Sequence, residues 1–437
     1  MSSNESAVDV AISQGPVRPL QWLVMVLCTL VVIFDGFDVQ AIAFTAPVLA
    51  TEWNLAPGQL GPVFAIGLLG MCIGALVLGP VGDWVGRKTA ILLSVAIFSL
   101  FSLLTATANG YEQLFIYRLL TGLGLGGALP NATALIAEFA PKRLRGLMIS
   151  VIFLGIPIGG MAGGMLAASL IPLWGWQSVF VLGGIGPLLL LPVLAIWLPE
   201  SMGFLAGLGA KGEQRLNRLS ARLEIDSSVL STPNQSADEP KLPLAQLFKG
   251  GLAGDTLLLW AAFFVNLMAI YFLISWIPSL LVKAGYGVSD GAYTAVALNV
   301  GGMVGPLVLA YLIARFGSRL SLVVYFICAG VSLGLLGRSG ESLQLMMVMT
   351  FFAGFFTFGA QIGLNVLAAS IYPTSARSTG VGWALGVGRV GSILGPILGG
   401  ILLGLGWAMP DYFGLFGLVL LVVVFFMLML KRHQSPV

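Results

Sequence analysis

Long apolar segments, separated by short polar loops, follow one another along almost the whole chain of 437 residues. A helix needs about 20 apolar residues to cross the ~30 Å hydrocarbon core of a bilayer. Twelve such segments are predicted, at residues 21–48, 58–80, 89–108, 112–138, 146–170, 178–198, 255–281, 291–313, 319–337, 342–370, 378–405 and 410–430. The pattern therefore predicts an all-α membrane protein with twelve transmembrane helices.

One long polar stretch, residues 199–252, divides these segments into two groups of six. The halves also share a spacing, since Pro141 and Arg145 follow the fourth segment as Pro373 and Arg377 follow the tenth. Internal repetition of this kind is typical of secondary transporters, whose binding site lies near the midplane between repeats. We therefore expect the following parts: an N-terminal tail (1–20), a six-helix bundle (21–198), a linker (199–252), a second six-helix bundle (253–430) and a C-terminal tail (431–437).

Composition and charge support this interpretation. Charged residues make up 9% of the chain, compared with about 25% in a typical soluble domain. Of the 21 Lys and Arg residues, Lys283 and Arg338 fall in the predicted outer loops, and Arg118 and Arg389 lie inside predicted helices. Because cytoplasmic loops carry the excess of basic residues, both termini and the linker are expected in the cytosol. The net charge of +3 therefore does not indicate a nucleic-acid partner.

Two acidic residues, Asp35 and Asp38, interrupt the first apolar segment. A charge at the bilayer centre costs roughly 2.5–3.5 kcal/mol on insertion scales. Three residues apart, the two acids share one face of a helix, and the helical rise places Arg118 of the fourth helix at about their depth. One explanation is a structural ion pair between an acid and Arg118. The other is a proton-coupling site. Two acids that share one arginine repel each other, and this repulsion together with desolvation favours a protonated carboxyl group.

The other intramembrane arginine, Arg389, has a planar guanidinium that is suited to bidentate binding of a carboxylate. Two buried arginines with two acids leave room for an organic anion that arrives with protons. Aromatic rings and amide groups on the predicted seventh and tenth helices suit a flat ring with polar substituents, although most such rings only pack against helices or lipid. The expected substrate-binding set is Arg389, Arg118, Asp38, Tyr271, Trp276, Phe355, Phe358, Gln361 and Asn365.

The remaining candidate chemistry is sparse. Glu138 lies at the inner end of the fourth helix, where Lys142 or Arg145 is the expected partner. All three cysteines fall inside apolar runs, so neither a disulfide framework nor a metal site is implied. The glycine runs lie within hydrophobic helices and lack the strand–turn–helix setting of phosphate loops. No cofactor is expected.

Several motifs resemble a known family. Gly79, Asp83, Gly86, Arg87 and Lys88 match the signature that the major facilitator superfamily carries between its second and third helices, and "RLLTGLGLGG" from Arg118 resembles its helix 4 motif. The "DGFD" from Asp35 to Asp38 and the run "ALPNATALIAEFAPKRLRG" resemble the aromatic acid/proton symporters of that superfamily. The resemblance covers nearly all of residues 20–430.

This resemblance implies two pseudo-symmetric bundles, alternating access and proton-driven import of benzoate-like acids such as 4-hydroxybenzoate or protocatechuate. It also implies a gate at the cytoplasmic face, where Asp83 pairs with Arg87 or Arg145. Trp84 stands where the family motif usually has a basic residue. In the copy of this motif in the second half of the chain, Ala314 and Arg315 stand where an acidic residue would be expected. The gate is therefore expected to be asymmetric. The expected gating set is Asp83, Arg87, Lys88, Glu138 and Arg145.

Other functions fit the sequence less well. Proton-antiport efflux of drugs or organic acids is the main alternative, because "GIPIGG" in the fifth helix loosely resembles exporters. A receptor would need a signalling domain, which residues 199–252 are too short to supply. An enzyme is disfavoured because the single histidine, His433, lies in the tail and no nucleophile with a base is visible. We expect the protein to be a monomer in the bacterial inner membrane. Its expected partners are an aromatic carboxylate, protons and lipid, and no nucleic-acid partner is expected.

Overall fold

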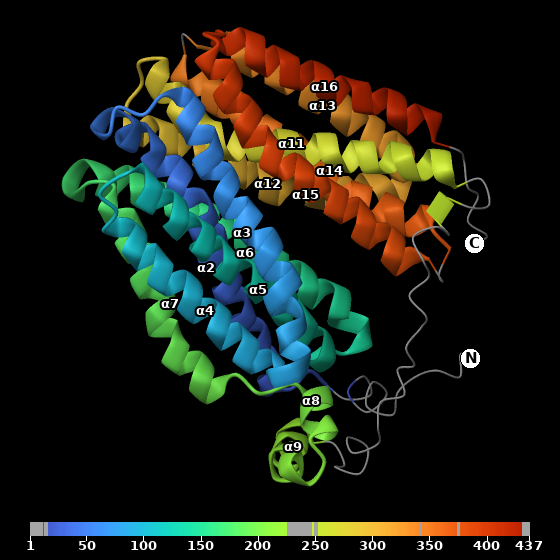
Figure 1. Cartoon of the computed structure of the whole chain (residues 1–437). Coiled ribbons are helices and arrows are strands. Elements are labelled where there is room, and N and C mark those ends of the chain that lie inside the picture. The colour runs from blue at the N-terminus through green and yellow to red at the C-terminus, as the bar shows by residue number, and fades with distance from the viewer. Residues whose placement is uncertain are drawn as a thin grey trace. The chain divides into compact units, whose positions relative to one another are not determined.

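A computed structural model describes residues 12, 16–224, 247–248, 252–340, 342–373 and 376–430. The predicted tails, residues 1–20 and 431–437, lie wholly or mostly outside the described residues, as does the second half of the predicted linker. The described part of the chain folds into helices and contains no β-strand (Figure 1). The predicted all-α class is confirmed.

Twelve helices of the described chain are long and apolar enough to cross a membrane, one for each predicted segment. A helix satisfies all of its backbone hydrogen bonds internally, which the hydrocarbon core requires. Two of the helices begin at a proline, whose missing N–H is not needed in a first turn. The twelve are α2 (Pro19–Glu52), α3 (Pro57–Val85), α4 (Arg87–Ala106), α5 (Tyr111–Phe139), α6 (Lys142–Trp174), α7 (Gln177–Trp197), α11 (Ala253–Lys283), α12 (Val288–Phe316), α13 (Ser318–Arg338), α14 (Leu343–Ile371), α15 (Arg377–Gly404) and α16 (Met409–Met429).

The first part of the predicted linker folds into two short helices, α8 (Met202–Gly207) and α9 (Ala210–Leu223), which follow α7 in Figure 1. Ser201 caps α8, because its Oγ accepts a hydrogen bond from the backbone N–H of Phe204 at 3.1 Å. Leu216, Leu219 and Leu223 of α9 are buried in the same apolar core as residues of α2, α5 and α7. This part of the linker is therefore packed against helices of the N-terminal half.

The chain divides into two compact units. Unit 1 comprises Met1–Val39, Leu69–Gly159 and Phe180–Glu239. It contains α4, α5, α8 and α9 completely, the first part of α2, and most of α3, α6 and α7. Unit 2 comprises Gln40–Leu68, Gly160–Val179 and Pro240–Val437, and so joins the remaining ends of α2, α3, α6 and α7 to α11–α16. The division therefore cuts four helices of the N-terminal half.

Close helix contacts hold each unit together. In unit 1, a Cβ added to Gly124 of α5 would lie 2.6 Å from the backbone nitrogen of Phe98 in α4, so only glycine fits this crossing. In unit 2, Gln40 of α2 and Asn299 of α12 exchange two amide hydrogen bonds, at 3.1 and 2.8 Å. Ser289 at the start of α12 donates to the carbonyl of Ala168 in α6 at 2.7 Å.

Candidate functional site

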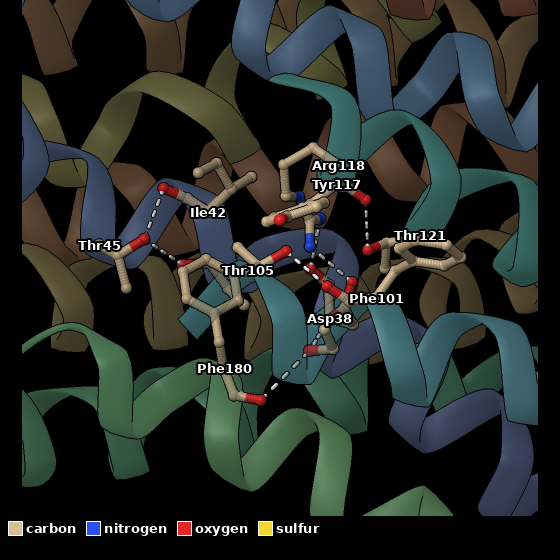
Figure 2. A network of polar contacts seen from close by, with 11 residues as sticks. Asp38, Ile42, Thr45, Phe101, Thr105, Tyr117, Arg118, Thr121 and Phe180 are labelled. Atoms are coloured by element: carbon tan, nitrogen blue, oxygen red, sulfur yellow. Dashed lines mark hydrogen bonds and ion pairs between the residues drawn. The ribbon is translucent and has the colours of Figure 1, made fainter. Parts of the chain in front are cut away.

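The centre of unit 1 contains a buried ion pair between α2 and α5. Nη1 of Arg118 lies 2.8 Å from Oδ2 of Asp38, and Nη2 donates to the backbone carbonyl of Asp38 at 3.0 Å. Figure 2 shows the two side chains pointing toward each other. Their exposed fractions are 3% for Arg118 and 0% for Asp38. The predicted meeting of an intramembrane acid with Arg118 is therefore observed at Asp38.

Two further helices complete the surroundings of this pair. Ser102 of α4 donates to Oδ1 of Asp38 at 2.7 Å, so both carboxylate oxygens accept a hydrogen bond. The hydroxyl of Ser102 also lies 3.2 Å from the carbonyl oxygen of Phe180 in α7. The ring of Phe180 lies beside the guanidinium, with 5.6 Å between Cζ of Arg118 and the ring centroid (Figure 2), which permits a cation–π interaction. Four helices thus converge on Asp38.

Ser102 is not among the site residues predicted from the sequence. A usable signal exists in α4, where Ser99, Ser102 and Thr105 recur every three residues within an apolar segment and are buried. Ser99 and Thr105 donate to carbonyls of their own helix, which is the common behaviour of such residues in apolar helices. The sequence alone does not show which of the three reaches an acid on another helix.

Asp35 lies three residues before Asp38 on α2 and is 2% exposed. Two carboxyl groups are therefore buried within one turn of a membrane-spanning helix.

A second polar cluster, in unit 2, contains residues of α11, α14 and α15. The hydroxyl of Tyr271 lies 3.4 Å from Nη1 of Arg389. Asn266, which is fully buried, donates to Oε1 of Gln361 at 2.9 Å and to the carbonyl of Thr357 at 3.1 Å. Within the described part of the chain, three buried amide atoms have no hydrogen-bond partner: Oδ1 of Asn266, Nε2 of Gln361 and Oδ1 of Asn365. Buried polar atoms normally find a partner, so these three are available to a bound molecule.

Three of the four aromatic residues in the expected substrate set make packing contacts. Phe355 stacks on Tyr325 of α13, with 5.7 Å between ring centroids. The ring of Phe358 lies against Gly302 of α12. Trp276 is 1% exposed, and its indole N–H donates to the carbonyl of Pro396 at 2.9 Å. These contacts stabilise unit 2, and a role of the three rings in substrate binding stays a prediction.

The motif between α3 and α4 forms a charged cluster with α5. Nη2 of Arg87 lies 3.6 Å from Asp83, as the resemblance implied, and Nε of Arg87 lies 2.9 Å from Glu138. Both oxygens of Glu138 also accept from Ser201, at 2.9 and 2.7 Å. The ion pair shown for Glu138 is thus with Arg87, a partner that helix position alone did not suggest. These residues line a cavity of about 360 Å³.

Two other residues of the expected gating set lie beside this cluster in the sequence. Lys88 donates from Nζ to the carbonyl of Ala195 in α7 at 2.6 Å, and its backbone N–H donates to Oε1 of Glu200 at 2.9 Å. Lys88 is therefore bound to the end of α7. Arg145 lies in the first turn of α6.

Replacing Ser102 by alanine tests how Asp38 is held. The variant removes one donor to a buried carboxylate, and hydrogen bonds to charged groups contribute about 1.5–3 kcal/mol. We expect a lower melting temperature for Ser102→Ala, measured by size-exclusion chromatography after heating. Ser99→Ala is the matched control, because the Ser99 hydroxyl donates to Val95 of its own helix. Equal melting temperatures for both variants would contradict the role assigned to Ser102.

The chain is similar to known transporters over nearly its whole length. Residues 28–337 and 293–437 match the Major Facilitator Superfamily. The chain is 40% identical over 419 residues to the gallate transporter of Pseudomonas putida, covering 95% of this chain and 93% of that protein. It is 38% identical over 404 residues to the 4-hydroxybenzoate transporter PcaK of Pseudomonas aeruginosa, covering 92% and 90%. Its fold is similar to that of the inward-open xylose transporter XylE from E. coli, with a TM-score of 0.72 at 17% identity, covering 95% and 97%.

Proposed function

Since the chain belongs to the major facilitator superfamily, we propose that this membrane transporter imports small aromatic carboxylates together with protons. The observation that carries the coupling is the buried pair of Asp38 and Arg118 with its serine donor. The substrate class is supported by relatives that transport gallate and 4-hydroxybenzoate, both of which are hydroxylated benzoates. Membership of this family makes the protein a transporter and not an enzyme.

Proton binding at Asp38 would change the contacts of α2 with α4 and α5. As a carboxylate, Asp38 attracts Arg118 of α5 and accepts from Ser102 of α4. Protonation removes the negative charge, so the Coulomb attraction to the buried guanidinium is lost. Arg118 then becomes available to another anion, which makes it a candidate contact for the substrate carboxylate. Asp35, buried on the same helix, is a second candidate proton carrier.

Recognition of the aromatic acid is assigned to the polar cluster of unit 2. The guanidinium of Arg389 is suited to a carboxylate, and Tyr271 lies beside it. The partnerless amide atoms of Asn266, Gln361 and Asn365 can accept from, or donate to, hydroxyl groups on the ring. A site built in this way favours hydroxylated acids, because an unsubstituted ring would leave buried polar atoms unpaired.

The remaining assignments follow the charge distribution. The protein is proposed to lie in the bacterial inner membrane with both termini in the cytosol, because the basic residues gather in the loops on that side. It is also proposed to act as a monomer. The cluster of Asp83, Arg87 and Glu138 is proposed as a gate at the cytoplasmic face. Its ion pairs would form and break as the transporter alternates between its two states.

Uptake into proteoliposomes tests the proposed function. Purified protein is reconstituted, and labelled 4-hydroxybenzoate, gallate and benzoate are supplied outside with the external pH one unit lower than the internal pH. We expect accumulation that a protonophore abolishes, and faster uptake of the two hydroxylated acids. Accumulation that is independent of the proton gradient would contradict coupling. Transport that requires the opposite gradient would identify the protein as an exporter.

A further inference from the structure

A second charged cavity, of about 460 Å³, lies where the end of α7 meets the start of α4 and one face of α9. Four of its lining residues are basic, namely Lys88, Arg215, Arg218 and Arg222, and one is acidic, Glu200. The cavity is distinct from the cluster of Asp83, Arg87 and Glu138, since no residue lines both. The excess of positive charge favours an anionic ligand.

Lys88 and Glu200 are already held by backbone groups. Nζ of Lys88 donates to the carbonyl of Ala195 at 2.6 Å. Oε1 of Glu200 accepts from the backbone N–H groups of Lys88 and Ser201, each at 2.9 Å. The negative charge of Glu200 is therefore directed toward the start of α4, where helix N–H groups stabilise it.

The three arginines lie on one face of a helix whose neighbouring face is packed in the core of unit 1. Arg215, Arg218 and Arg222 are spaced by three and four residues, so they share one face of α9, and all three are exposed. Leu216, Leu219 and Leu223, each one residue after one of these arginines, are buried in the core of unit 1. None of the three arginines forms an ion pair with any residue that the structure describes. A helix thus presents three guanidinium groups in a preformed row.

The other wall of the cavity is apolar and continues along the exposed face of α7. Ile196 and Trp197 at the end of α7 line the cavity and are 74% and 54% exposed. Leu182, Ile185 and Leu189 of α7 are also exposed and recur at helical spacing, as expected for a face that contacts acyl chains. Tryptophan at the end of a membrane-spanning helix is typical of the headgroup level.

We propose that this cavity binds the headgroup of an anionic phospholipid in the leaflet that faces α9. The guanidinium groups would bind the phosphate, for which their planar geometry is suited, and the acyl chains would lie along the exposed face of α7. Basic pockets beside membrane-spanning helices are suited to anionic headgroups. A soluble phosphate would use only the arginines, whereas a lipid uses both the arginines and the adjoining apolar wall.

Native mass spectrometry of the purified full-length transporter tests this proposal. The protein in detergent is titrated with phosphatidylglycerol, with phosphatidylcholine and with inorganic phosphate. We expect phosphatidylglycerol to bind at least about tenfold more tightly than phosphatidylcholine, and each arginine replaced by alanine to weaken its binding roughly fivefold. The variants are Arg218→Ala, Arg222→Ala and the triple alanine variant of all three arginines. Lys211→Ala, which removes an exposed charge of α9 outside the cavity, is the matched control and should bind like the wild type.

Each outcome decides the proposal. Loss of phosphatidylglycerol preference in the arginine variants but not in Lys211→Ala would support it. Unchanged binding by the triple variant, equal binding of the two lipids, or displacement of phosphatidylglycerol by millimolar phosphate would overturn it. If the triple variant does not elute as a single species from size exclusion, the two single variants decide the result, since each changes one exposed side chain. Lipid binding is measured without transport, so the result is independent of the proposed substrate.

Discussion

Replacing Asp38 by asparagine is expected to abolish accumulation of aromatic acid driven by a pH gradient. Asparagine carries no titratable proton, so binding and release of a proton can no longer be linked to transport. The substitution also leaves the guanidinium of Arg118, which is 3% exposed, without its anion. Breaking a buried pair by removing one partner costs about 3–5 kcal/mol. Accumulation in proteoliposomes and melting temperature should both fall.

The double variant Asp38→Asn/Arg118→Gln separates these two effects. It removes both charges, and with them the uncompensated buried cation, so we expect the melting temperature to recover while accumulation stays absent. Glu112→Gln, which changes an exposed carboxylate at the start of α5, is the control for charge removal elsewhere on that helix. Full gradient-driven accumulation by Asp38→Asn would exclude Asp38 as the coupling residue and leave Asp35 as the candidate.

Replacing Arg389 by alanine is expected to have the second largest effect, on substrate affinity. If this guanidinium binds the substrate carboxylate, its removal leaves the carboxylate without a cationic partner. The free energy of binding is then weaker by about 2 kcal/mol or more. The dissociation constant for 4-hydroxybenzoate should then rise about 30-fold or more. Binding is measured by scintillation proximity with the detergent-solubilised protein, so no proton gradient is involved.

Two further variants show whether the effect belongs to the geometry of the arginine. Arg389→Lys keeps the positive charge but lacks the planar pair of donors, so an intermediate affinity is expected. Arg377→Ala removes an exposed arginine from the first turn of the same helix and should bind like the wild type. Unchanged affinity in Arg389→Ala would assign this arginine to the packing of unit 2.

The twelve helices could be predicted because one physical requirement governs them. A segment that crosses the hydrocarbon core must be apolar for about 20 residues and must bond its own backbone. Both properties are local, so they can be seen without knowledge of neighbouring helices. Asp35, Asp38 and Arg118 are unusual for an equally local reason, because the free-energy cost of a charged side chain in the membrane depends on its depth.

The linker shows where local reasoning was insufficient. Residues 199–252 are polar and turn-rich on average, yet α9 forms within them because Leu216, Leu219 and Leu223 bury one face against helices of the N-terminal half. Helices in proteins owe most of their stability to such packing. The partner surface is built from α2, α5 and α7, so the sequence of the linker alone does not contain it.

By itself, the sequence determined the class of fold, the number of membrane-spanning helices and the short list of charged residues inside them. Only the tertiary structure showed that Asp38 is the acid that Arg118 pairs with, that Ser102 supplies its second donor and that Arg87 pairs with Glu138. The reason is that hydropathy is a property of each segment, whereas an ion pair between helices depends on the rotation and depth of both. Those quantities are set by close packing at sites such as Gly124.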